Sequence, residues 1–209
     1  MELTDKALKI VEILEEIYPE SQCSLRYEKP YELLIATRLS AQCTDARVNM
    51  VTGALFERFP TIEAFAEATP EDVEPYIRSC GLYHTKARDI VALAKALVEN
   101  YGGNVPDNLE ELTALPGVGR KTANLIMGDV YHQPAVVTDT HCIRICKRLG
   151  LTTGDNPYKT EMELREILPM DRSSDFCHRL VNFGRDTCTA RNPKCENCKL
   201  KDLCEEKTL

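Results

Sequence analysis

The sequence predicts an all-α fold. Apolar residues recur at helical spacing in almost every segment. In the first segment they lie on one helix face at Leu3, Ala7, Ile10, Val11, Leu14 and Ile17. The one apolar run that resembles a strand, AVVT at 135–138, is short and more typical of an extended connector between helices.

Proline and glycine separate the later helical patterns in order along the chain. The patterns cover about 30–40, 44–58, 61–68, 71–79, 84–100, 109–114, 120–131, 140–149, 158–168 and 173–183. The breakers between them are Pro60, Pro70, Gly81, Gly102, Gly103, Pro106, Pro116, Gly117, Pro134, Gly150, Gly154, Pro157 and Pro169. No repeat of fixed period and no low-complexity tract interrupts this order.

Composition is that of an ordinary globular protein. Among 209 residues, 43% are hydrophobic and 28% charged, which argues against a disordered or fibrous chain. No apolar run approaches the roughly 18 residues of a membrane-spanning helix. The acidic N-terminal segment does not resemble a secretory signal, so we expect a cytoplasmic protein without a membrane partner.

The net charge of −7 counts against a polyanionic partner, but the charges are unevenly placed. Residues 1–20 contain six acids and two lysines, whereas residues 117–150 contain five Lys or Arg and two acids. Because salt screens distant charges within about 10 Å, a local basic face can exist on an acidic protein. Nucleic-acid binding therefore remains open.

The stretch LPGVGRKTANLIMGDV, residues 115–130, predicts a tight turn between two helices. Pro116 fixes φ, and Gly117 and Gly119 can adopt positive φ without steric cost. Such a turn exposes backbone N–H groups beside the positive end of the second helix, which suits an anion such as a DNA phosphate. A plain helix–helix turn would explain the same glycines.

Four cysteines near the C-terminus predict a metal site. In CTARNPKCENCKLKDLC, six, two and five residues separate successive cysteines, which are Cys188, Cys195, Cys198 and Cys204. Four thiolates this close together can converge on one centre, and the residues alone leave zinc and an iron–sulfur cluster open. The other cysteines are expected to pack as small hydrophobes, including the pair Cys142 and Cys146 four residues apart.

Five motifs together resemble the endonuclease III family of DNA glycosylases. They are LSAQCTD at 39–45, GLYHTKA at 81–87, LPGVGRKTAN at 115–124, VTDTHCIRICKRLG at 137–150 and the C-terminal cysteines. The resemblance covers nearly the whole chain in the family's order. It implies a helical barrel domain over 23–133, containing a helix–hairpin–helix at about 109–131. It also implies a second domain formed by 1–22 and 134–209, with a [4Fe–4S] loop at 188–204 and a DNA cleft between the domains.

The resemblance implies a bifunctional DNA glycosylase/AP lyase of base excision repair that removes oxidised pyrimidines from duplex DNA. Lys121 would attack C1′, form a Schiff base and allow β-elimination 3′ to the abasic site. Lysine is ordinarily protonated, and the helix N-terminus, Arg120 and desolvation would favour the neutral amine. Asp139 would activate the nucleophile or stabilise positive charge on the sugar, and it is also a good helix N-cap. His141 and Arg144 are expected to support the structure.

The partner implied is double-stranded DNA containing damaged bases or abasic sites. Because the target nucleotide must leave the stack, side chains must fill the gap, and the resemblance assigns Gln42 and Leu82. A polar residue before a helix cap and a core leucine are the structural alternatives. Further DNA contacts are expected at the hairpin residues Leu115, Gly117, Val118, Gly119 and Arg120.

Two other classes of function remain open at the sequence level. One is a non-catalytic DNA-damage sensor, against which the presence of both Lys121 and Asp139 counts; the other is a zinc-bound helical interaction protein. Thr138 and Lys147 depart from the family's usual valine and asparagine, and the pI of about 5.2 is low for it. These departures bear on substrate range and DNA affinity. We expect a monomer, associated with the nucleoid when bound to DNA.

Overall fold

The structure, a computed structural model, describes residues 2–206 and confirms the all-α prediction for them. The chain divides into two compact units. One consists of Cys23–Tyr131, and the other combines Met1–Gln22 with His132–Leu209. No helix of the described chain is long and apolar enough to cross a membrane.

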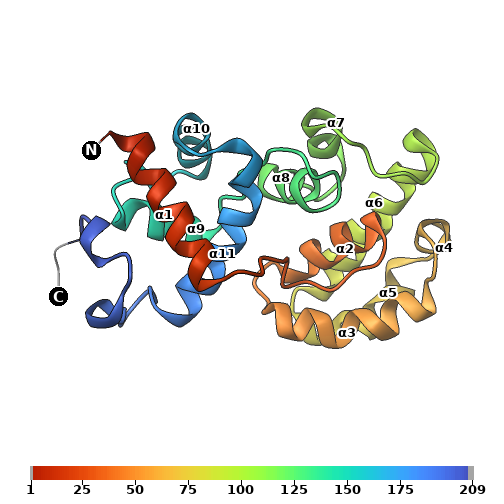
Figure 1. The fold of residues 1–209 in the computed structure, drawn as a ribbon. Coiled ribbons are helices and arrows are strands. Elements are labelled where there is room, and N and C mark those ends of the chain that lie inside the picture. The colour runs from red at the N-terminus through yellow and green to blue at the C-terminus, as the bar shows by residue number, and fades with distance from the viewer. Residues whose placement is uncertain (1, 207–209) are drawn as a thin grey trace. The chain divides into compact units, whose positions relative to one another are not determined.

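The Cys23–Tyr131 unit is organised around its longest helix, α6. Helices α4 and α5 pack along α6, and α2 contacts α3, α6 and α8 (Figure 1). Aromatic rings fill the core near α4, where the centroids of Phe59 and Phe65 are 4.9 Å apart. The helices are α2 (Pro30–Ser40), α3 (Asp45–Arg58), α4 (Ile62–Glu67), α5 (Pro70–Ile77), η1 (Arg78–Cys80), α6 (Tyr83–Tyr101), α7 (Leu109–Ala114) and α8 (Arg120–Asp129).

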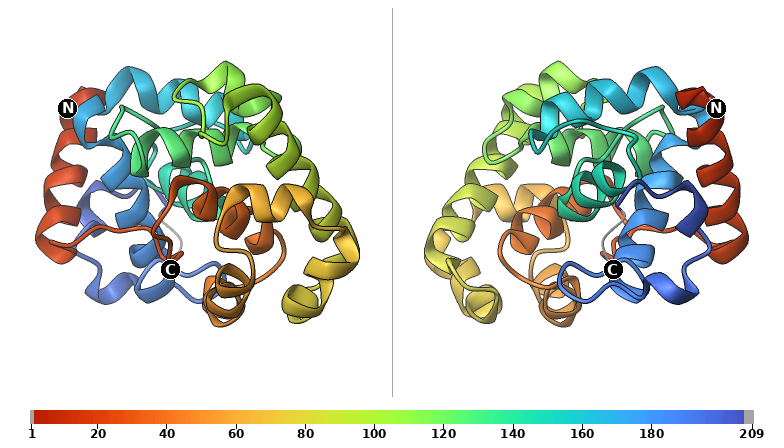
Figure 2. Two further views of the ribbon diagram at one scale, coloured as in Figure 1. Left: turned by 90° about the vertical axis from the view of Figure 1, so that its right-hand side faces the viewer. Right: turned by 90° about the vertical axis from the view of Figure 1, so that its left-hand side faces the viewer.

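The second unit joins the two ends of the chain. Helix α1, red in Figures 1 and 2, packs against α10 and α11, blue, although more than a hundred residues separate them in sequence. Ile10 and Leu14 of α1 and Phe176 and Leu180 of α11 are all buried. The helices are α1 (Leu3–Ile17), α9 (Thr140–Arg148), α10 (Pro157–Ile167), η2 (Met170–Arg172), α11 (Ser173–Asp186), η3 (Cys195–Asn197) and η4 (Lys201–Leu203).

Local capping explains where five of the described helices begin. The side chains of Thr44, Thr61, Asn108, Asp139 and Asn156 each accept a hydrogen bond from a first-turn N–H group. The predicted helices are confirmed, with ends mostly within one or two residues of the expected positions.

Three expectations about local structure were wrong. Pro70 and Pro157 do not separate helices but are the first residues of α5 and α10, because the first helical position needs no N–H donor. Leu3, expected on the buried face of α1, is 42% exposed because it lies in the first turn, where the helix begins.

The segment 135–138 is a buried connector and not a strand, as predicted. Its polar backbone is partly satisfied by a side chain, since the Val137 N–H donates to Cys177 Sγ over 3.3 Å. The connector leads directly to Asp139 at the start of α9.

Candidate functional site

The hairpin between α7 and α8 is a tight turn over Leu115–Val118. The Val118 N–H donates to the Leu115 carbonyl over 3.1 Å, Pro116 follows Leu115, and Gly117 has φ +74°. A positive φ at the third residue is the requirement of a type II turn, and proline is common at the second. Gly119 does not share this conformation: its φ is −92° and its ψ 171°, so the expectation of two positive-φ glycines was wrong.

An ion pair lies beneath Gly117. Arg38 of α2 donates from Nε to Asp89 Oδ2 of α6 over 2.7 Å. A Cβ added at Gly117 would lie 3.4 Å from Arg38 Cδ and 3.4 Å from Asp89 Cβ. The turn therefore packs on side chains from two other helices, which hold it in place within the unit.

The hairpin exposes Pro116 and its two glycines and buries its two large aliphatic side chains. Leu115 is 4% exposed and Val118 8% exposed, so both side chains anchor the turn in the core. Gly119 is the N-cap of α8 and has no side chain with which to bond the first-turn N–H groups. A Cβ at Gly119 would meet no atom within 4 Å. The N-terminus of α8 is therefore open to an external acceptor.

Lys121 lies in the first turn of α8 and is exposed, whereas the preceding Arg120 is half-buried. The hydrogen bonds and ion pairs identified within its unit do not include the Lys121 ammonium. Because the side chain is exposed, the unit itself does not supply the desolvation that we expected from the sequence.

Asp139 belongs to the other unit and is the N-cap of α9. Its Oδ1 accepts from the Cys142 N–H over 2.7 Å, which confirms the predicted capping role. The cap fixes the carboxylate's direction and leaves Oδ2 available for other interactions. Thr138, which precedes it, is buried.

Gln42 and Leu82 share an unusual backbone conformation. Gln42 has φ +55° and Leu82 φ +49°, values that side chains other than glycine rarely adopt. Both side chains are exposed, and Leu82 is 59% exposed. The alternative of an ordinary core leucine at position 82 is therefore wrong.

Sequence reasoning missed Lys86, whose side chain is fully buried behind these two residues. Its Nζ donates to the carbonyls of Leu39 and Cys80 over 2.8 and 2.9 Å. The signal was present, because Lys86 falls on the same helix face as Ile90 and Leu97, which are also buried. A lysine on such a face calls for an explanation.

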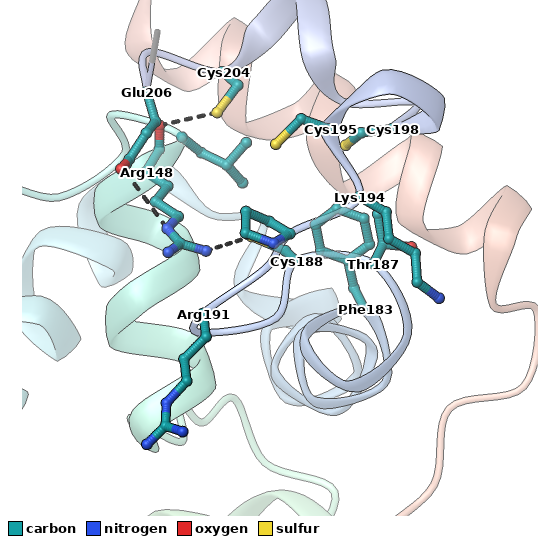
Figure 3. A pocket seen from close by; sticks show the side chains of 12 residues that line it. Arg148, Phe183, Thr187, Cys188, Arg191, Lys194, Cys195, Cys198, Cys204 and Glu206 are labelled. Carbon is teal, nitrogen blue, oxygen red and sulfur yellow. Dashed lines mark hydrogen bonds and ion pairs between the residues drawn. The ribbon is translucent and has the colours of Figure 1, made fainter. Parts of the chain in front are cut away.

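The four C-terminal cysteines line one cavity of about 250 Å³ in the second unit. The thiols are free, and Figure 3 shows those of Cys195, Cys198 and Cys204 on the same side of it. Burial raises the pKa values of Cys198 and Cys204. Among residues 2–206, no three His, Cys, Asp or Glu side chains converge closely enough for a single metal ion. Four cysteine thiols around one cavity are a donor set that fits an iron–sulfur cluster.

Arg148 at the end of α9 closes one wall of this cavity (Figure 3). Its guanidinium donates to Cys188 Sγ over 3.4 Å and to the Thr189 carbonyl over 2.9 Å. Its carbonyl accepts from the Cys204 thiol over 3.3 Å. These contacts place positive charge beside the sulfurs, which favours thiolates and a negatively charged cluster.

Neighbouring residues of α9 are structural, as expected. Arg144 donates to the Cys188 carbonyl over 2.9 Å and lies 3.2 Å from His141 Nδ1. A Cβ at Gly184 of α11 would come within 2.2 Å of His141 Nδ1, so glycine allows this close helix packing. Cys142 and Cys146 are fully buried, in agreement with packing as small hydrophobes.

The family model of HhH-GPD superfamily base excision DNA repair proteins matches residues 35–170, and that of the iron-sulfur binding domain of endonuclease III matches residues 188–204. The chain is 43% identical to the endonuclease III of Synechocystis sp. over 200 residues, which cover 95% of this chain and 91% of that one. The chain belongs to the endonuclease III family.

Other endonuclease III proteins are similar to nearly the same degree over most of their length. The endonuclease III of Escherichia coli K12 is 41% identical, with 97% of this chain and 96% of that one covered. A solved structure of a trapped endonuclease III–DNA covalent intermediate superposes with a TM-score of 0.93. The two sequences are 42% identical, and the superposition covers 99% of this chain and 97% of the solved one. The family's cofactor is an iron–sulfur cluster, and the cysteine-lined cavity fits it.

Proposed function

We propose that Lys121 is the nucleophile of a bifunctional DNA glycosylase/AP lyase. As a member of the endonuclease III family, the chain is a base excision repair enzyme that acts on oxidised pyrimidines in duplex DNA. The observation that carries the residue assignment is the exposed Lys121 in the first turn of a helix whose N-terminus is open at Gly119. A phosphate held at that N-terminus brings a deoxyribose within reach of the amine.

The reaction proceeds in two stages at one sugar. The neutral Lys121 amine forms a bond to C1′ while the bond from C1′ to the base breaks, and the base leaves with that electron pair and takes up a proton. Opening of the sugar ring gives a protonated Schiff base. Loss of a C2′ proton then expels the 3′ phosphate, which nicks the strand by β-elimination.

We assign Asp139 to the same sugar. Its carboxylate either accepts the proton of the attacking amine or stabilises positive charge as the base departs. The N-cap bond to the Cys142 N–H supports this assignment because it holds one oxygen in place and leaves the other for chemistry. A carboxylate fixed by capping loses less freedom when it acts.

The hairpin serves as the phosphate-binding element of this proposal. The N–H groups at Gly119, Arg120 and Lys121 supply the contacts, and the buried Leu115 and Val118 hold the turn. Such contacts are independent of base sequence, as a repair enzyme that scans DNA requires.

Gln42 and Leu82 are proposed to fill the gap left by the flipped nucleotide. Leu82 is an exposed apolar side chain, as a wedge between bases requires, and Gln42 can hydrogen-bond the unpaired base. Insertion offsets the few kcal/mol that unstacking costs.

Cys188, Cys195, Cys198 and Cys204 are the proposed ligands of the [4Fe–4S] cluster. When bound, the cluster ties together a loop that has few apolar residues, so its role here is structural. The exposed basic residues around it, such as Arg191 and Lys194, would lie beside DNA phosphate or offset the cluster's negative charge. We further propose that the protein is cytoplasmic and associates with the nucleoid through its substrate.

Borohydride trapping tests the assignment of the nucleophile. Wild-type protein mixed with abasic duplex DNA and borohydride should give a covalent adduct, since borohydride reduces a Schiff base. Lys121→Gln should lower both adduct yield and strand nicking by roughly a thousandfold or more. The control is Lys95→Gln, which alters an exposed lysine of α6.

Adduct formation by Lys121→Gln at the wild-type rate would overturn the proposal. Base release by the wild type without any adduct would indicate a glycosylase that lacks lyase chemistry. Lesion binding with neither base release nor an adduct would indicate a damage sensor.

A further inference from the structure

The Lys86 ammonium joins two segments of the Cys23–Tyr131 unit that are far apart in sequence. Lys86 lies on the first turn of α6 and is fully buried. Its Nζ donates 2.8 Å to the Leu39 carbonyl near the C-terminus of α2 and 2.9 Å to the Cys80 carbonyl at the end of η1. Both carbonyls stand at helix ends, where acceptors lack partners within the helix and carry negative partial charge.

Each of these two carbonyls lies a few residues before an exposed residue of this unit whose backbone is left-handed. Leu39 lies three residues before Gln42, and Cys80 lies two residues before Leu82. The Lys86 N–H also donates to the Leu82 carbonyl over 3.0 Å. Lys86 therefore hydrogen-bonds to the segments that lead into both turns.

Left-handed backbone is disfavoured at glutamine and leucine because Cβ approaches the following carbonyl oxygen. Such residues keep this conformation where the surrounding structure holds them in it. The two Lys86 hydrogen bonds supply that restraint, because each fixes the segment that enters a turn. An apolar side chain at position 86 would fill the space and leave both carbonyls without a donor.

The surroundings of the ammonium are those of a permanent structural contact. Burial lowers the pKa of Lys86; the nearby Cys43 and Cys80 thiols act in the opposite direction, and Arg38 lowers it further. No nucleotide can reach a side chain without exposed surface. Lys86 acts through its neighbours and does not touch DNA.

We propose that Lys86 is the positioning residue for base flipping, because it holds Gln42 and Leu82 in the geometry in which both enter the duplex together. This inference rests on the proposed roles of Gln42 and Leu82. A wedge held loosely would lose part of its insertion energy to ordering itself on the DNA.

The experiment compares two substrates that differ in the cost of flipping. One carries an oxidised pyrimidine in fully paired duplex, and the other carries the same lesion in an unpaired loop, where stacking is already lost. Lys86→Met should lower single-turnover base release from the duplex by roughly tenfold and leave release from the loop within about twofold of wild type. Lys95→Met, on the exposed face of the same helix, is the matched control.

A double-mutant cycle distinguishes positioning from general damage. If Lys86 acts through Gln42 and Leu82, then Lys86→Met should change the duplex rate by less than about twofold in a background that carries both Gln42→Ala and Leu82→Ala. Fluorescence of 2-aminopurine beside the lesion should show weaker unstacking with Lys86→Met than with wild type. Equal losses on duplex and loop substrates, or independent effects in the cycle, would overturn the inference.

Folding is checked by thermal unfolding of each variant. Should Lys86→Met fail to unfold cooperatively, Lys86→Leu, which also removes both N–H donors, takes its place with the same expected ratio. Absence of a borohydride adduct with the wild type would defeat the proposed function itself. A wild-type adduct together with an unchanged duplex-to-loop ratio in the variants would defeat the positioning role alone.

Discussion

Replacing Gly117 by alanine should destabilise the protein by about 1–2 kcal/mol, the cost of the left-handed conformation for a residue with a Cβ. The φ of +74° is imposed by the type II turn and cannot relax without moving the start of α8. The added methyl would be in ordinary contact, 3.4 Å from Arg38 Cδ and Asp89 Cβ, so steric overlap contributes little. The expected fall in Tm is about 2–8 °C for a chain of this size.

Gly119→Ala is the matched variant two residues away. Its φ of −92° suits any residue, and a Cβ there would meet no atom within 4 Å. Alanine caps a helix less well than glycine but lowers the entropy of the unfolded chain, so the two effects largely cancel. Stability should therefore stay within about 0.5 kcal/mol of wild type. The methyl would instead occupy space that a phosphate needs, so DNA affinity should fall.

Two measurements separate the variants. Urea unfolding followed by circular dichroism gives the free energy of unfolding, and titration with duplex DNA containing an abasic-site analogue, at one fixed salt concentration, gives the affinity. Equal destabilisation by the two substitutions would refute the assignment of positive φ to Gly117 alone. Wild-type DNA affinity in Gly119→Ala would refute phosphate binding at this helix N-terminus.

Asp139→Asn should leave thermal stability almost unchanged, because asparagine and aspartate cap a helix equally well. The same substitution should abolish base release. Turnover at the wild-type rate would limit the role of Asp139 to capping. Arg148→Met removes the hydrogen bond to Cys188 Sγ, so the visible absorbance of the cluster should decay faster in air than it does in the control Lys147→Met. Equal decay in the two variants would contradict the role of Arg148 beside the cluster. Burial raises the pKa of the Cys23 thiol from 9.0 to about 12. The unfolded chain therefore loses this proton first, and stability falls as pH rises from 9.0 to about 12. Cys23→Ala should flatten this part of the pH–stability curve, and an unchanged slope would contradict the burial of that thiol.

The helices could be predicted from the sequence because their signals are local. Apolar spacing, caps such as Asn108 and Asp139, and the Pro116–Gly117 turn each act within a few residues. The clearest error at element boundaries, the placement of Pro70, also has a local cause, because proline can either break a helix or begin one. The cysteine spacing predicted a metal site for the same reason.

Local patterns could not distinguish the two glycines of the hairpin. Gly117 and Gly119 look alike in sequence, but the type II turn over Arg38 and Asp89 requires positive φ at one of them only. Likewise, a leucine is usually a core residue, but Leu82 is exposed because it lies in a turn at the start of α6.

The amino-acid sequence by itself determined the helical class, the order of the helices, the four-cysteine site and the chemistry available to Lys121 and Asp139, because each depends on residue type and short spacing. Tertiary structure alone decided that Leu115 and Val118 face inward. It alone also decided that the Lys86 ammonium meets carbonyls of two distant segments. Burial and hydrogen bonding between segments far apart in the chain arise when helices pack, and no local pattern encodes which partner each side chain will find.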